Sequence, residues 1–211
     1  MTETWTVFAD SIKIVGGAIA FSFAYYQYRR AERWKTVEFA ALRMKEFEAD
    51  EKIQAALTML DWTDRPVPLR SNKTGETKPV VVSEAMLLRS LLSFSPPDGF
   101  TDVEASIRDC FDRFLDSLVR LQAFIETRAV RHEDLKPYIL YWLQLTSGQG
   151  REQHTAEFYA LLHVYINKYG FDPAWELMKS YGYGLRHSIQ ETEAAEKKAL
   201  AMPREPTARQ S

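Results

Sequence analysis

The chain has 211 residues, of which 45% are hydrophobic and 27% are charged, so most of it is expected to fold around a core. Its formal net charge of −2 excludes a general electrostatic attraction to nucleic acid. A single cysteine, Cys110, excludes an internal disulfide and is typical of a reducing compartment.

An uncharged stretch near the N-terminus runs from Ile14 to Tyr28. As a helix it spans about 22 Å, which is shorter than the roughly 30 Å hydrocarbon core of a bilayer. A helix that begins near Trp5 is long enough if Asp10 and Lys13 lie in its outer turns and pair with each other. We therefore predict a single transmembrane helix here.

Three other interpretations of this stretch remain open. A cleaved signal peptide normally begins with positive charge, whereas Glu3 and Asp10 precede this stretch. A helix buried in the core of a soluble protein is favoured by the short uncharged length. A helix lying flat in the membrane surface needs one charged face, but residues 14–26 carry no charge.

A basic cluster follows the apolar stretch and predicts its orientation. Its members are Arg29, Arg30, Arg33 and Lys35, and the one acid among them is Glu32. The positive-inside rule then places the C-terminal bulk in the cytoplasm, with these basic residues at the membrane interface. An aromatic belt at the same boundary, made of Tyr25, Tyr26, Tyr28 and Trp34, agrees with this orientation.

Small residues recur at every fourth position of the apolar stretch. Gly16, Ala20 and Ala24 would line one stripe of a helix, where a second helix can approach closely. The stripe indicates self-association within the membrane.

The rest of the chain predicts an all-α cytoplasmic domain of about six helices. We expect the anchor at residues 1–30, the helical domain at 31–200 and a disordered tail at 201–211. No Gly or Pro occurs between Gln27 and Thr63, so the anchor is expected to continue into a cytoplasmic stalk.

Several helix boundaries carry recognisable signals. Asp50 and Ser83 are expected N-caps, and Thr101 with Glu104 forms a capping box before the expected core helix. Further helices are expected from near Pro137, over residues 152–169, and from an Asp172 N-cap with Pro173 as first residue. Residues 191–198 carry no apolar stripe and predict a solvated or frayed helix.

One segment departs from the helical pattern. Prolines and a glycine interrupt residues 61–82, which excludes a regular helix. Residues 67–70 and 79–82 predict either one short β-hairpin or an ordered loop.

Three carboxylates, Asp109, Asp112 and Asp116, are spaced to share one helix face. They could serve a hydrolase, or form a solvated face with Arg113 and Arg108 as partners of Asp109 and Asp112. Cys110 is expected on the apolar side without an activating neighbour. We assign no catalytic residue.

The histidines show no metal-binding spacing, so we predict no metal and no cofactor. His154 and Glu157 share a face one turn apart, as an ordinary surface pair or a proton-transfer pair. His163 lies near an apolar face and is expected to be a packing residue.

A ligand site is the remaining possibility for chemistry. Arg186 follows a Gly-Tyr-Gly segment where a loop could approach a phosphate, although a turn accounts equally for the glycines. Tyr138, Tyr141 and Trp142, with aromatic residues of the following helix, would line either a pocket or the core.

Four segments, YYQYRRAERWK, EFEADEKIQAALTMLDW, RDCFDRFLD and PYILYW, span Tyr25 to Trp142. Their layout resembles small bacterial membrane-anchored proteins grouped as a domain of unknown function. The resemblance implies a bacterial inner-membrane protein and brings no activity or site.

These observations give three functional hypotheses. The first is a single-pass, membrane-anchored interaction or effector module that self-associates or binds a protein partner. The second is a ligand-responsive, nucleotide-sensing membrane protein, and the third is a hydrolase that uses the acidic helix face.

Overall fold

The computed structural model describes residues 2–63, 65–149, 153–184 and 189–202, and side chains from residue 19 onward except those of residues 189 and 190. Over these residues the chain forms eight helices and one two-stranded antiparallel sheet, which confirms a mainly helical fold. Among the residues whose side chains are described, which begin at residue 19, no helix is both long enough and apolar enough to cross a membrane.

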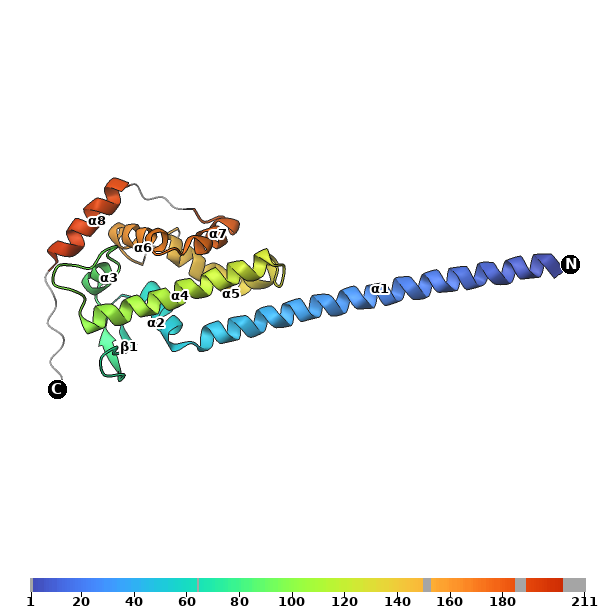
Figure 1. Cartoon of the computed structure of the whole chain (residues 1–211), viewed down its shortest axis with the longest axis horizontal. Coiled ribbons are helices and arrows are strands. Elements are labelled where there is room, and N and C mark those ends of the chain that lie inside the picture. Colours follow the sequence, from blue (N-terminus) through green and yellow to red (C-terminus); the bar gives the residue numbers. More distant parts are fainter. Residues whose placement is uncertain (1, 64, 150–152, 185–188, 203–211) are drawn as a thin grey trace.

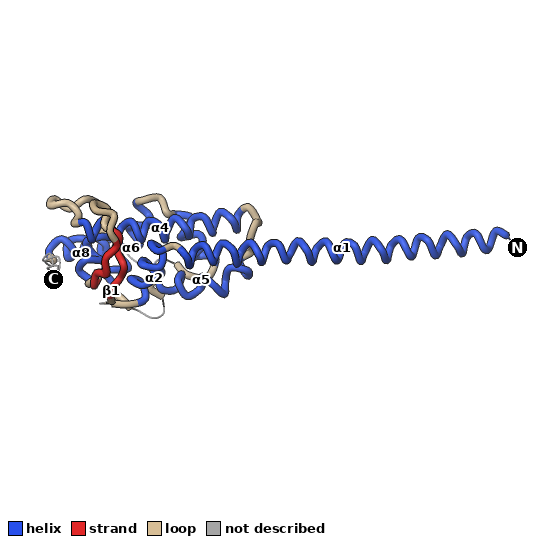
Figure 2. Tube along the Cα trace, turned by 90° about the horizontal axis from the view of Figure 1, so that it is seen from below, coloured by secondary structure: helices blue, strands red, loops and turns tan. Residues whose placement is uncertain are grey.

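The elements form a compact helical body from which one long helix projects (Figures 1 and 2). The helices are α1 (Thr2–Ala49), α2 (Glu51–Asp61), α3 (Glu84–Ser90), α4 (Asp102–Glu126), α5 (His132–Ser147), α6 (Ala156–Lys168), α7 (Asp172–Ser180) and α8 (Ile189–Ala201), and the strands are β1 (Pro66–Arg70) and β2 (Thr77–Val81).

The projecting helix is α1, whose 48 residues give it a length of about 72 Å. Only its last turns join the helical body, where Ala40, Met44 and Phe47 are buried at helical spacing against α2 and α5. Asp50 then separates α1 from α2 and caps α2 by accepting hydrogen bonds from the amides of Lys52 and Ile53. The predicted cap is confirmed, and so is the expectation of an unbroken helix through the apolar stretch and beyond it to Ala49.

The centre of the body is α4, which contacts α2, α3 and α7. Ile107, Phe111, Phe114 and Leu118 repeat at three- and four-residue spacing on one face and are fully buried. The predicted capping box is present, because Thr101 accepts from the Glu104 amide and the Glu104 carboxylate accepts from the Thr101 amide.

The predicted hairpin is confirmed with slightly shifted strands. Pro66 of β1 pairs with Val81 of β2, and the antiparallel register continues to the pair of Arg70 and Thr77. Val67 and Leu69 are buried against α2 and α4, whereas β2 is mostly exposed. Prolines in both strands reduce the backbone donors that a further strand would need.

Three predicted helix starts are wrong. Helix α6 begins at Ala156, directly after the N-cap Thr155 and four residues after the predicted start at residue 152. Helix α5 begins at His132, five residues before Pro137, because the acids Glu133 and Asp134 favour a helix N-terminus and Pro137 is exposed, where a missing helix bond costs least. In α7 the N-cap is Phe171 rather than Asp172, which is the first helical residue.

The expectation of a solvated C-terminal helix is also wrong. Helix α8 packs on α6 and α3, with Ala195 and Ala199 fully buried. Alanines four residues apart let two helices approach closely, although they give little hydropathy signal. The Nζ of Lys198 and the Oε1 of Glu157 on α6 add an ion pair of 2.6 Å.

Candidate functional site

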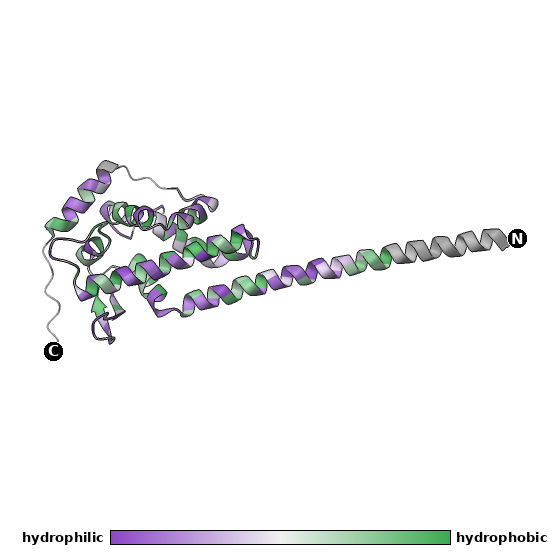
Figure 3. Cartoon of the chain, viewed as in Figure 1, coloured by the Kyte–Doolittle hydropathy of each residue, from purple (hydrophilic) through white to green (hydrophobic). Residues whose placement is uncertain are grey.

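The most unusual surface of the molecule is the exposed apolar segment of α1, residues 19–28. Every residue from 19 to 35 is exposed, and the large apolar side chains of this segment are 55–74% exposed: Ile19, Phe21, Phe23, Tyr25, Tyr26 and Tyr28. Figure 3 shows the part of this segment next to the undescribed side chains as a hydrophobic band on α1, followed by paler turns where the tyrosines lie. No face of the segment is covered by another part of the described chain.

A basic collar, made of Arg29, Arg30, Arg33 and Lys35, follows this segment on α1. All four side chains are exposed, and Arg29 lies 3.9 Å from the Glu32 carboxylate and 5.9 Å from the centre of the Tyr25 ring. The helix therefore changes within one turn from an apolar, aromatic surface to a positive one. Such a change matches the boundary between the hydrocarbon and headgroup regions of a bilayer.

The predicted packing stripe is only partly described. Ala20 and Ala24 are exposed and lie on the uncovered part of α1. Gly16, together with the first residues of the predicted span, lies outside the described side chains.

Aromatic side chains pack α1 against the C-terminal end of α4. The Phe39 and Phe124 rings meet edge to face at 5.2 Å, and the guanidinium of Arg43 lies 4.8 Å from the Phe39 ring and 5.8 Å from the Phe124 ring. Arg43 also donates to Glu46 at 2.6 Å. The long helix is therefore held by ring contacts as well as by its three buried residues.

The joint between α1 and α2, which lies at Asp50, is stabilised by an ion pair. The Nε of Arg113 on α4 donates to the Asp50 carboxylate at 2.7 Å, while Asp50 also caps α2. Burial raises the pKa of the Asp50 carboxyl, but hydrogen bonds from Arg113 and the Ile53 amide outweigh it and hold the pKa below its usual value of 3.8. Sequence spacing missed this pair because 63 residues separate its members.

A small cavity of about 160 Å³ lies at the same joint. Three arginines line the cavity. Each is paired with an acid: Arg43 with Glu46, Arg113 with Asp50, and Arg120 with Asp116. Its charge is thus balanced within the protein.

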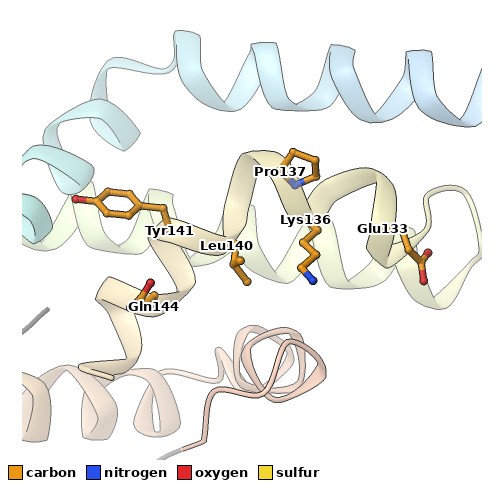
Figure 4. A pocket seen from close by; sticks show the side chains of 6 residues that line it. All are labelled: Glu133, Lys136, Pro137, Leu140, Tyr141 and Gln144. Atoms are coloured by element: carbon orange, nitrogen blue, oxygen red, sulfur yellow. The ribbon is translucent and has the colours of Figure 1, made fainter. Parts of the chain in front are cut away.

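A larger depression of about 550 Å³ follows α5 (Figure 4). All its lining side chains come from that one helix: Glu133, Lys136, Pro137, Leu140, Tyr141 and Gln144. Because one helix face provides every contact, the depression is open and offers no opposing wall to enclose a ligand.

The predicted aromatic ligand set does not converge on this depression. Tyr141 lines it and donates its hydroxyl to Asp61, Tyr138 is exposed, and Trp142 is half-buried against the Tyr141 ring. Phe158 and Tyr165, from the same predicted set, are fully buried in the core. Arg186 lies outside the described residues.

The three helix-face carboxylates have separate partners. Asp109 pairs with Lys52 at 3.3 Å, Asp112 accepts from the Tyr165 hydroxyl at 2.5 Å, and Asp116 pairs with Arg120 at 2.6 Å. The predicted partner of Asp109 is wrong, because Arg113 pairs with Asp50 instead. Asp112 accepts its hydrogen bond from Tyr165 rather than from the predicted partner Arg108, whose charge still acts on it. In the described part of the chain, no cluster of acidic, histidine or cysteine side chains is arranged to hold a metal ion.

Burial raises the pKa of two neighbouring groups on α4, Asp112 and Cys110. Burial raises the pKa of Asp112, although the hydrogen bond from Tyr165 and the Arg108 charge oppose it. Burial also raises the pKa of the Cys110 thiol to about 12, so this cysteine is expected to stay protonated and unreactive.

The predicted surface pair of His154 and Glu157 is wrong. The His154 side chain is fully buried, and its Nδ1 lies 2.9 Å from the Glu84 carboxylate on α3. Burial raises the pKa of Glu84, but hydrogen bonds from His154 and Thr155 outweigh it and lower the pKa overall. His163 is buried with its Nε2 3.2 Å from the Thr146 carbonyl, which confirms its packing role.

No protein-family model, curated protein or solved structure matches this chain. The exposed apolar segment and its basic collar are therefore the features on which a functional proposal can be built.

Proposed function

We propose that this chain is a single-pass membrane protein whose N-terminal helix, from about Trp5 to Tyr28, lies in a bilayer and carries a cytoplasmic helical interaction module. The observation that carries the proposal is that every large apolar side chain at positions 19–28 is exposed. A helix that is apolar on every face normally lies in a core or in lipid.

Energetics favour an apolar environment around this segment. Removing one large aliphatic or Phe side chain from water is worth about 1.5–3 kcal/mol, and three of these are exposed here: Ile19, Phe21 and Phe23. Tyr25, Tyr26 and Tyr28 add exposed aromatic rings with a polar tip, as side chains at a membrane interface do. Residues 19–28 carry no charged side chain on any face, so a bilayer satisfies the segment better than a one-sided groove does.

Charge supports the orientation of the anchor. The basic collar lies on the domain side of the apolar segment, so the positive-inside rule assigns the helical domain to the cytoplasm. The reducing environment there suits the single buried Cys110. With the resemblance noted above, this supports the inner membrane of a bacterium.

An interaction role suits the domain better than catalysis. The helix-face carboxylates are engaged separately, and the depression on α5 has one wall. We infer that the module works by binding a protein partner or a second copy of itself.

Membrane extraction tests the proposal. The full-length chain should stay with membranes in alkaline carbonate and be released by detergent, whereas Phe21→Asp with Phe23→Asp should move it to the soluble fraction. Leu42→Asp is the matched control, because Leu42 is exposed on the same helix outside the apolar segment. Release of the unchanged chain by carbonate alone would contradict the proposal.

The cavity at the joint favours a second candidate, a ligand-responsive membrane protein. An anion that displaced Glu46 or Asp50 from Arg43 or Arg113 would act directly on the attachment of α1. A thermal-shift screen with nucleotides and inorganic phosphate tests it. A shift that Arg113→Gln abolishes would support ligand sensing, and no shift with any anion would remove it.

A further inference from the structure

The turn between α4 and α5, residues 127–131, is the part of the helical domain that reaches furthest along the projecting α1 (Figures 1 and 2). Helix α4 runs antiparallel to α1, because Arg113 contacts Asp50 while Phe124 contacts Phe39. In the register set by these two contacts, each residue further towards the C-terminus of α4 lies beside a residue one position closer to the N-terminus of α1. Arg128 therefore lies near the level of Lys35.

This register places the turn close to the proposed membrane boundary. From Lys35 to Arg29 is six residues, or about 9 Å along the helix. That distance is close to the Debye length of about 8 Å at physiological ionic strength, so charges on the turn would still feel anionic headgroups.

The turn carries two arginines at positions where the backbone conformation favours other residue types. Arg128 is exposed and has a φ of 60°, a left-handed conformation that helix ends usually give to glycine. Arg131 is exposed at the N-cap of α5, makes no side-chain capping bond, and sits at the positive end of the helix dipole. Residues that do not suit their local backbone are expected where the function requires their side chains, and Arg128 and Arg131 are two such residues.

The surroundings of the turn hold it firmly and leave both arginines available. Val130 is buried and its amide donates to the Phe124 carbonyl at 3.2 Å, while Tyr181 donates to the His132 carbonyl at 2.7 Å. The acids closest to the turn in the sequence are Glu126, Glu133 and Asp134. Glu126 accepts from Gln122 one turn back along α4, and the other two occupy the first turn of α5.

We propose that the α4–α5 turn is a second membrane contact, in which Arg128 and Arg131 bind anionic lipid headgroups and hold the domain against the bilayer. This inference rests on the proposed anchor in α1. Together with the basic collar, the two arginines would make a two-point attachment that fixes the tilt of α1 relative to the surface.

A label at the turn tests this contact. An environment-sensitive fluorophore is attached at Ala129→Cys, which is exposed, whereas Cys110 is buried. The full-length chain is reconstituted in vesicles of phosphatidylcholine alone or with 30% phosphatidylglycerol, each containing a headgroup-linked quencher. We expect quenching in the anionic vesicles, and its loss in about 0.5 M salt, where the Debye length is only a few ångströms.

Two double variants separate lipid binding from structural effects. Arg128→Gly with Arg131→Ser should raise the melting temperature by a few degrees, because both residues suit the backbone better, and should reduce headgroup contact on the order of tenfold. Lys73→Gln with Lys78→Gln, on the hairpin at the other end of the domain, should leave the contact unchanged.

Each outcome is decisive. Equal quenching in neutral and anionic vesicles, or full quenching in the Arg128 and Arg131 variant, would overturn the second contact and leave the anchor standing. A chain that enters neither kind of vesicle would overturn the anchor and the contact together.

Discussion

Single residues at the joint decide how firmly the domain holds α1. Asp50 combines two roles, because one carboxylate oxygen caps α2 and the other accepts from Arg113. A local signal predicts the cap, whereas the ion pair depends on a residue 63 positions away. The two roles can be separated by substitution.

Asp50→Ala should lower the free energy of unfolding by about 1–2 kcal/mol, because it removes the cap and the ion pair. Asp50→Asn retains a capping oxygen and should cost less than about 1 kcal/mol, since Arg113 is substantially exposed and solvent screens the pair. Denaturant titration in detergent measures both values. Equal losses in the two variants would show that the cap contributes nothing.

The pH dependence of this site follows from the lowered pKa of Asp50. The folded state binds the Asp50 proton less tightly than the unfolded chain, so this stabilisation is fully present above about pH 5 and is lost as the pH falls through 3.8 and below. Unfolding titrations from pH 6 to pH 3 should therefore show a steeper loss in the unchanged chain than in Asp50→Asn. Parallel curves would contradict the assignment.

Asp112 is expected to behave in the opposite way. Its raised pKa means that burial disfavours the charge, so Asp112→Asn should leave stability at pH 7 unchanged or raise it by up to about 1 kcal/mol. The amide oxygen can still accept from Tyr165. Any advantage of the variant should shrink as acid protonates the aspartate. A marked loss of stability at pH 7 would instead show that the structure uses this charge.

At the scale of elements, helix ends could be predicted where a residue acts on its own backbone. The Thr101 capping box and the Asp50 cap are examples, because their partners lie within three residues. The docking of α8 depends on packing between distant segments, and its composition carries little signal. The pairing of His154 with Glu84 could not be predicted for the same reason, because 70 residues separate the two in the sequence.

Two glycine helix ends give a matched test of element packing. Gly148 closes α5 with a φ of 67°, and a Cβ there would lie 2.8 Å from the Tyr159 ring. Gly170 follows α6 with a φ of 78° and has open space around it. Gly170→Ala should cost about 1–2 kcal/mol for the left-handed backbone, and Gly148→Ala should cost about 1–3 kcal/mol more.

Denaturant titration of the two glycine variants, side by side, measures this difference. Equal destabilisation would indicate that the Tyr159 ring moves without cost. A larger loss at Gly170 than at Gly148 would contradict the described packing of α5 on α6.

At the scale of the whole molecule, the long α1 ties the exposed apolar segment rigidly to the helical domain. The sequence predicts the apolar segment, the basic collar and the continuous helix, since each depends on neighbouring residues. It could not predict the α4–α5 turn near the collar, because that follows from the antiparallel register of α4 and α1. A partner-binding surface is likewise a property of the assembled body.

The depth of α1 in lipid tests the account most directly. Nitroxide labels at Ser22→Cys and Leu42→Cys, in full-length chain reconstituted in vesicles, report collisions with oxygen, which concentrates in lipid, and with a nickel chelate, which stays in water. The account predicts that position 22 is reached by oxygen and not by nickel, and that position 42 shows the reverse. Nickel access at position 22 equal to that at position 42 would contradict it.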